Sequence, residues 1–118
     1  MNRFTERDMD SLMRILDYCD RIRAIKNRFG DSLESFLDDP DYRDAIKMNL
    51  SQIGETVNTL SDDCKEQIDE VPWHEIYGMR NIIGHGYIKV KDEIIWQTAA
   101  FDIPALEKKI EKAISMDQ

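Results

Sequence analysis

The chain has 118 residues, of which 42% are hydrophobic and 34% are charged, and its net charge is −8. This length suits one domain spanning residues 1–118, and the composition excludes a disordered chain. No apolar run approaches the roughly 20 residues that cross a membrane, and the N-terminus MNRFTERDMD is too polar for a signal peptide. We therefore expect a cytoplasmic protein with no membrane partner.

The first predicted helix is long and follows Thr5. Apolar residues recur at steps of three and four from Met9 to Phe29, so they form one stripe along a single helix. Thr5 suits the N-cap position of this helix, and Gly30 suits its C-terminal stop.

Two further helices follow, and a proline separates them. The segment DSLESFLDDP predicts a short helix that ends at Asp39–Pro40. Pro40 then suits the first turn of the next helix, because that position needs no backbone N–H. The apolar pattern carries this helix to Leu60, and Gly54 and Glu55 lie within it.

The second half of the chain predicts further helices bounded by prolines. A short helical turn begins at Ser61 and ends at Val71–Pro72, and a longer helix runs from Trp73 to about Ile83. The segment GHGYIKVKD interrupts the pattern, and DEIIWQTAAFD and PALEKKIEKAISM supply two more helices divided at Pro104. Because no segment alternates at period two, we predict an all-α bundle of four or five main helices.

Charge is distributed unevenly along the chain. Residues 1–28 have a balance of +2, residues 29–72 of −9 and residues 73–118 of −1. The net acidity argues against non-specific nucleic-acid binding, although the outer thirds leave room for a locally positive groove. We expect the acidic stretch to be a solvated face, and we favour a solvated stripe over an RNA track for Arg14, Arg21 and Arg28.

The cysteines and histidines do not predict a metal site. Cys19 and Cys64 are the only cysteines, and we expect both to be small buried hydrophobic residues. There is no CxxC pair, and His74 and His85 lack the HExxH spacing. We therefore expect neither a bound metal nor another cofactor.

The segment RNIIGHGY, residues 80–87, combines side chains that suit phosphodiester chemistry. Arg80 offers a fork of donors for phosphate oxygens, and His85 can exchange a proton near neutral pH. RNA brings its own nucleophile, the 2′-hydroxyl, so such a pair can cleave it without a metal. The same residues at a helix end also suit a plain capping arrangement.

Helical geometry separates the two side chains. On a straight helix, a residue five positions after Arg80 points roughly 140° away from it. Arg80 and His85 therefore meet one small ligand only if the helix unwinds near Gly84, or if a second chain completes the site.

The segment RNIIGHGY matches an R-x4-H-x-Y motif, and the chain around it resembles the HepT-like toxins of the HEPN superfamily. Ile-Gly-Glu in QIGETVNTLS, then Pro-Trp, Gly-Met-Arg-Asn, His-x-Tyr and a later Trp occur in the family's order. The resemblance spans nearly the whole chain. It implies an all-α HEPN-like bundle that forms a homodimer, and a metal-independent endoribonuclease toxin of a type VII-like toxin–antitoxin system.

The resemblance also implies roles for individual residues. Arg80 and His85 correspond to the catalytic pair, in a cleft on the dimer interface where RNA is cut. Asn81 either supports this site or caps the helix, and Glu55 either orients the pair or makes a buried hydrogen bond between helices. Tyr87 corresponds to the tyrosine to which a cognate MntA-like nucleotidyltransferase antitoxin attaches AMP.

The chain departs from the family's pattern in two places. His74 lies where the family often has a basic residue, and we expect it at the surface. Gly84 replaces a larger apolar residue, which loosens the expected helix end.

Two other functions stay open. The chain can be a non-catalytic HEPN module whose cleft binds a nucleotide or a nucleotidyltransferase and acts as a scaffold. It can also be a plain helical interaction protein in which RNIIGHGY only ends a helix.

Overall fold

The structure is a computed structural model that describes residues 3–85 and 91–117, with the backbone alone for Asn81, Ile82, Gly84 and His85. The long helices are α1 (Glu6–Phe29), α3 (Pro40–Val57), α5 (Trp73–His85) and α7 (Ile103–Asp117). The short elements are α2 (Leu33–Asp38), α4 (Asp62–Gln67), α6 (Asp92–Gln97) and the π-helical turn η1 (Thr98–Asp102). These residues contain no strand, so the predicted all-α bundle of four or five main helices is confirmed.

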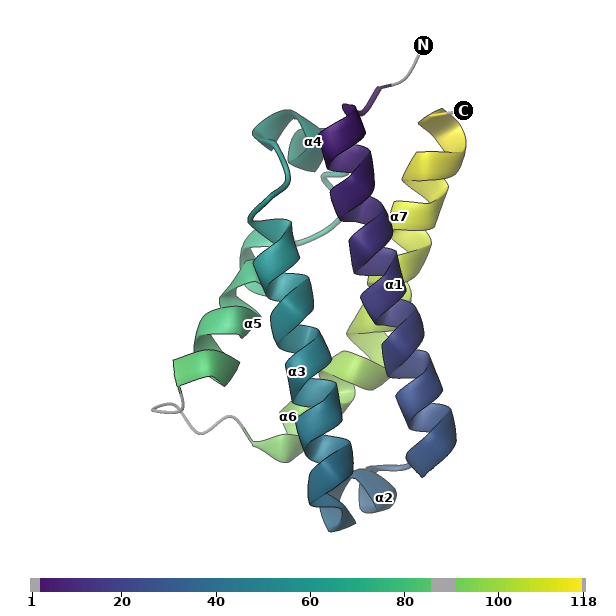
Figure 1. The fold of residues 1–118 in the computed structure, drawn as a ribbon, viewed down its shortest axis with the longest axis vertical. Coiled ribbons are helices and arrows are strands. Elements are labelled where there is room, and N and C mark those ends of the chain that lie inside the picture. Colours follow the sequence, from purple (N-terminus) through teal and green to yellow (C-terminus); the bar gives the residue numbers. More distant parts are fainter. Residues whose placement is uncertain (1–2, 86–90, 118) are drawn as a thin grey trace.

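The helices are arranged around α1 and α3, which lie side by side (Figure 1). Helix α7 runs along α1, and α5 packs on α3 through the most extensive contact between any two elements. The two ends of the described part of the chain lie together, because the Arg3 guanidinium donates to the Ala113 carbonyl over 3.0 Å and pairs with Asp117. None of the described helices combines the length and the apolar character that crossing a membrane requires.

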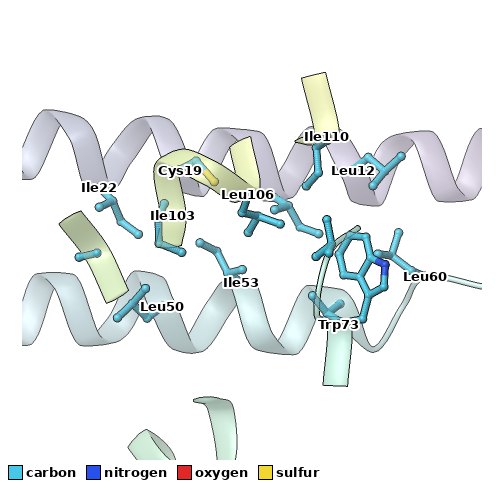
Figure 2. Packing of buried hydrophobic residues seen from close by; sticks show 14 of the residues in the cluster. Leu12, Cys19, Ile22, Leu50, Ile53, Leu60, Trp73, Ile103, Leu106 and Ile110 are labelled. Atoms are coloured by element: carbon cyan, nitrogen blue, oxygen red, sulfur yellow. The ribbon is translucent and has the colours of Figure 1, made fainter. Parts of the chain in front are cut away.

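The core lies between α1, α3 and α7. Figure 2 shows their apolar side chains meeting, with Trp73 closing one end of the cluster. The members labelled there are Leu12, Cys19, Ile22, Leu50, Ile53, Leu60, Trp73, Ile103, Leu106 and Ile110. Burial raises the pKa of both the Cys19 and the Cys64 thiol to about 12, so both are inert apolar residues, as predicted.

The predicted helix caps are present. The Thr5 hydroxyl accepts from the Asp8 N–H over 3.0 Å and so begins α1. Gly30 ends α1 with φ at 112°, a conformation that favours glycine, and its N–H donates to the Lys26 carbonyl. Side-chain N-caps also begin the next three helices, at Ser32, Asp39 and Ser61.

Helix α3 ends earlier than predicted, at Val57 rather than Leu60. The N–H groups of residues 58–60 bond to carbonyls three residues back, which forms a tight turn. The Thr59 hydroxyl donates to the Thr56 carbonyl over 2.6 Å and so competes with helical bonding. Leu60 nevertheless stays buried, which is why the apolar pattern continued past the helix end.

The division predicted at Pro104 takes a different form. No loop separates α6 from α7, because η1 joins them and the Ile103 N–H donates to the Thr98 carbonyl. A proline cannot bond to the carbonyl four residues back, and its ring crowds that carbonyl. The wider π turn just before Pro104 accommodates both effects, so the helical path continues without a break.

The surface charges follow the prediction. Every acidic side chain in residues 29–72 is exposed except Asp39, which is half-buried, so the acidic stretch is a solvated face. Arg14, Arg21 and Arg28 are also exposed, and Arg21 pairs with Asp17 over 3.4 Å. The solvated stripe is therefore confirmed.

One buried carboxylate joins α1 to the start of α4. Asp8 accepts from the Ser61 N–H over 2.9 Å and from the Ser61 hydroxyl over 2.5 Å. Burial alone raises the pKa of Asp8, but the hydrogen bonds from Ser61 and Thr5 outweigh it and hold the pKa below the usual 3.8. The folded state therefore favours the ionised carboxylate.

Asp8→Ala is expected to lower the free energy of unfolding by about 1–3 kcal/mol at pH 7, because Ser61 loses its acceptor. The folded-state pKa lies below the unfolded value, so this stabilisation is present above about pH 4 and is lost as the pH falls below it. Urea unfolding at pH 7 and pH 3 measures both effects. Asp10→Ala, an exposed neighbour on the same helix, is the control, and an equal loss in both variants at pH 7 contradicts the role of Asp8.

Candidate functional site

The site begins where α5 lies directly on α3. A Cβ atom at Gly54 would lie 3.0 Å from the Ile76 carbonyl oxygen and 3.2 Å from both the Cβ and the N atom of Arg80. Only the missing side chain of Gly54 therefore permits this approach. Arg80 starts at the point of closest contact, so Gly54 sets the position from which its side chain extends.

The Arg80 guanidinium has two partners. Its Nε forms an ion pair with Oε2 of Glu55 on α3, and its Nη1 donates to the Tyr77 hydroxyl over 3.3 Å. The Arg80 side chain is 41% exposed and that of Glu55 53% exposed, so both stay in contact with solvent. Such an ion pair contributes little to stability, but it restricts where the guanidinium points.

Two roles were predicted for Glu55: contact with the catalytic pair, or a buried hydrogen bond between helices. The structure brings Glu55 and Arg80 together across two helices, so contact with the predicted catalytic arginine is present. The alternative of a buried hydrogen bond between helices is wrong, because the Glu55 side chain is 53% exposed.

Arg80 and His85 were expected to meet either by unwinding of the helix near Gly84 or through a second chain, and the backbone of α5 does not show the unwinding. Helix α5 stays helical from Trp73 through His85, so it does not unwind at Gly84 before reaching the histidine. The side chains of Asn81 and His85 are not among the described parts, and Tyr87 lies outside the described residues.

The other histidine lies apart from Arg80. His74 is exposed on the first turn of α5, at the surface as expected.

The two tryptophans of the motif have structural roles. Trp73 is 8% exposed, and its Nε1 donates to the carbonyls of Ile68 over 3.0 Å and Lys65 over 3.2 Å, which closes the C-terminal end of α4. Trp96 packs against the rings of Phe36 and Tyr42, with centroids 5.5 Å and 6.1 Å away. Both fix the helices around the site rather than taking part in it.

Arg80 does not line the cavity that lies next to α5. This cavity of about 300 Å³ separates the first turns of α5 from η1 and α7, and Ile76 and Met79 line it, while Arg80 does not. Within residues 3–80 and 91–117, no group of His, Cys, Asp and Glu side chains gathers to hold a metal ion. The half-exposed Arg80 guanidinium is therefore reached from the surface and not through this cavity.

Tyr77 contacts Arg80, although the sequence analysis assigned it no role. It stands three residues before Arg80, which places both on one face of a helix. That spacing was the available signal, but spacing alone does not show that the hydroxyl faces the guanidinium.

Comparison with known proteins identifies the family. The family model described as "Ribonuclease HepT-like" matches residues 15–113. The chain belongs to the HepT-like ribonuclease family. A "putative RNase" of Caldanaerobacter subterraneus subsp. tengcongensis is 36% identical, over 91% of this chain and 94% of that protein. No solved structure gives a significant match.

Two archaeal relatives agree with this assignment. A "putative RNase" of Methanocaldococcus jannaschii is 32% identical, over 85% of this chain and 81% of that protein. A "probable ribonuclease HepT" of Thermococcus cleftensis is 37% identical, over 67% of this chain and 72% of that protein. The all-α HepT-like fold and membership in a ribonuclease family, both expected from the sequence, are therefore confirmed.

Proposed function

We propose that this HepT-like chain is a homodimeric, cytoplasmic endoribonuclease toxin that cleaves RNA without a metal ion. The observation that carries the proposal is the half-exposed Arg80 guanidinium, held by Glu55 in a member of a ribonuclease family. Arginine presents donors that match the non-bridging oxygens of a phosphodiester. Arg80 and His85 are the proposed catalytic residues, and Asn81 and Glu55 support them.

In the proposed reaction, His85 removes the proton from a ribose 2′-hydroxyl. The 2′-oxygen then forms a bond to phosphorus, and the bond to the 5′-oxygen breaks. The 5′-oxygen takes a proton from water as it leaves, and His85 returns its proton to the solvent. The products are a 2′,3′-cyclic phosphate and a 5′-hydroxyl. Arg80 stabilises the negative charge that grows on the phosphoryl oxygens, and a positioned general base contributes about 10²–10⁴ in rate.

The geometry of α5 supports the proposed dimer. Because the helix is regular through His85, positions 80 and 85 of one chain face directions roughly 140° apart. A second copy of the chain brings its own histidine to the arginine of the first, and a two-fold axis repeats this arrangement. Each dimer then contains two complete pairs.

The proposed regulator is an MntA-like nucleotidyltransferase antitoxin. The Tyr87 hydroxyl attacks the α-phosphorus of ATP, pyrophosphate leaves, and AMP stays attached to the tyrosine. The added negative charge and bulk lie two residues after His85 in the sequence, and both oppose the approach of an anionic substrate.

One experiment tests these proposals. The purified chain is expected to cut labelled RNA in the presence of EDTA and to leave cyclic phosphate ends. Incubation with ATP and the nucleotidyltransferase is expected to add one AMP mass to the peptide that contains Tyr87, and to stop cleavage. If the chain binds the nucleotidyltransferase tightly but cuts no RNA, it is a scaffold module instead.

A further inference from the structure

Two partners hold the Arg80 guanidinium in place, and they differ in charge. Glu55 takes the Nε edge as an ion pair, and the Tyr77 hydroxyl accepts from Nη1 over 3.3 Å. The stem of Arg80 is fixed as well, because its Cβ lies against α3 at Gly54. The side chain is therefore restrained at its base and at two points on the guanidinium.

These contacts leave donors for a substrate. Arginine carries N–H groups on Nε, Nη1 and Nη2 in a rigid plane. The Glu55 carboxylate is paired with Nε and one Nη1 hydrogen is directed to Tyr77. The second Nη1 hydrogen and the Nη2 hydrogens are then available to a substrate, and this pair of nitrogens matches two phosphate oxygens. A tyrosine that accepts here fixes the rotation of the plane without adding a negative charge beside the phosphate.

We infer that Tyr77 is a positioning residue that orients the Arg80 guanidinium toward the scissile phosphate. This inference rests on the proposed ribonuclease function. Glu55 alone leaves the guanidinium free to turn about the Nε–Cζ bond, because the ion pair engages only the Nε side of the group. The Tyr77 contact on Nη1 removes that freedom, and preorganised donors cost no rearrangement during the reaction.

The chain offers a matched comparison for Tyr77. Tyr18 and Arg21 on α1 have the same spacing of three residues, and both tyrosines are half-buried. There the arginine lies over the ring, 5.4 Å from its centroid, and pairs with Asp17. The described residues provide no hydrogen bond to the Tyr18 hydroxyl, so Tyr18→Phe removes the same atom without breaking a contact to arginine.

Tyr77→Phe keeps the ring and removes the hydroxyl. We expect kcat for RNA cleavage to fall about tenfold, the lower end for a hydrogen bond to a charged group, with KM changed less than twofold. Tyr18→Phe is expected to leave kcat unchanged. In an Arg80→Lys background, where the planar fork is absent, Tyr77→Phe is expected to cause no further loss, because the two side chains act as one unit.

A second readout does not depend on activity. In protein labelled with ¹⁵N-arginine, the Nη signals of Arg80, assigned with Arg80→Lys, are expected to show slower rotation in wild type than in Tyr77→Phe. Equal kcat in wild type and Tyr77→Phe, or equal Nη rotation, overturns the inference. If the wild type cuts no RNA at all, the proposed ribonuclease function is wrong, and the inference about Tyr77 is wrong with it. If the wild type cuts RNA and Tyr77→Phe cuts equally well, only the inference is wrong, so the two failures are distinguishable.

Discussion

Arg80→Ala is expected to lower kcat for RNA cleavage by about 10²–10³, and His85→Ala is expected to lower it by about 10²–10⁴. These factors are the usual cost of removing a donor aimed at the growing charge and of removing a general base. The measurement is single-turnover cleavage of labelled RNA with EDTA present. Unfolding of the Arg80 variant should change little, because that side chain is half-exposed and its ion pair is solvated.

The chain supplies close controls for both variants. His74 is the other histidine and lies exposed on the first turn of α5, and Arg14 is an exposed arginine on α1. His74→Ala and Arg14→Ala are expected to cut at the wild-type rate. If all five proteins cut equally, Arg80 and His85 have no catalytic role. If only the Arg80 variant fails, another group serves as the base.

Mixing the two inactive variants tests whether the site is shared between subunits. In a randomly exchanged mixture of Arg80→Ala and His85→Ala chains, about half of the dimers are mixed, and each mixed dimer regains one shared site of two. About a quarter of the wild-type activity is then expected to return. If no activity returns, each chain carries its own pair, and the regular course of α5 through His85 does not describe the active enzyme.

Local rules predicted most of the fold, because each helix carries its own signals. Thr5 begins α1 and Gly30 ends it through contacts within a few residues, as predicted, and Asp39 and Ser61, which were predicted at helix boundaries, act as N-caps of α3 and α4. The errors arose where distant or competing bonds decide the outcome. Helix α3 stopped early because of hydrogen bonds in the turn after it, and Pro104 produced a π turn rather than a break.

The contacts of the predicted site residues could not be read from the sequence. The motif pointed to Glu55 and Arg80, but no spacing rule relates a residue on α3 to one on α5. That relation depends on Gly54, which decides how closely the two helices pack. The contact from Arg80 to Tyr77 depends in turn on where Glu55 draws the guanidinium. The contacts of Arg80 with Glu55 and Tyr77 therefore depend on tertiary packing, which the sequence alone did not predict.

Gly54→Leu is expected to damage both the fold and the activity. Its Cβ would already lie 3.0 Å from the Ile76 carbonyl oxygen and 3.2 Å from the Arg80 backbone, and backbone atoms of α5 cannot turn aside as a flexible side chain does. Overpacking of this kind costs about 3 kcal/mol, which lowers the unfolding midpoint by about 10 °C. A displacement of Arg80 by about 1 Å lowers kcat by roughly 10²-fold in addition.

Gly54→Ala separates the two effects. Alanine in a helix is favoured over glycine by about 1 kcal/mol, which offsets part of the crowding, so the free energy of unfolding should change by less than about 1 kcal/mol. The kcat should still fall about tenfold, because α5 must shift to make room and Arg80 shifts with it. Gly78→Ala is the stability control, since a Cβ there meets nothing within 4 Å and should stabilise the protein. If Gly54→Ala instead cuts RNA at the wild-type rate with unchanged stability, close packing of α5 on α3 does not set the position of Arg80, the proposed catalytic arginine.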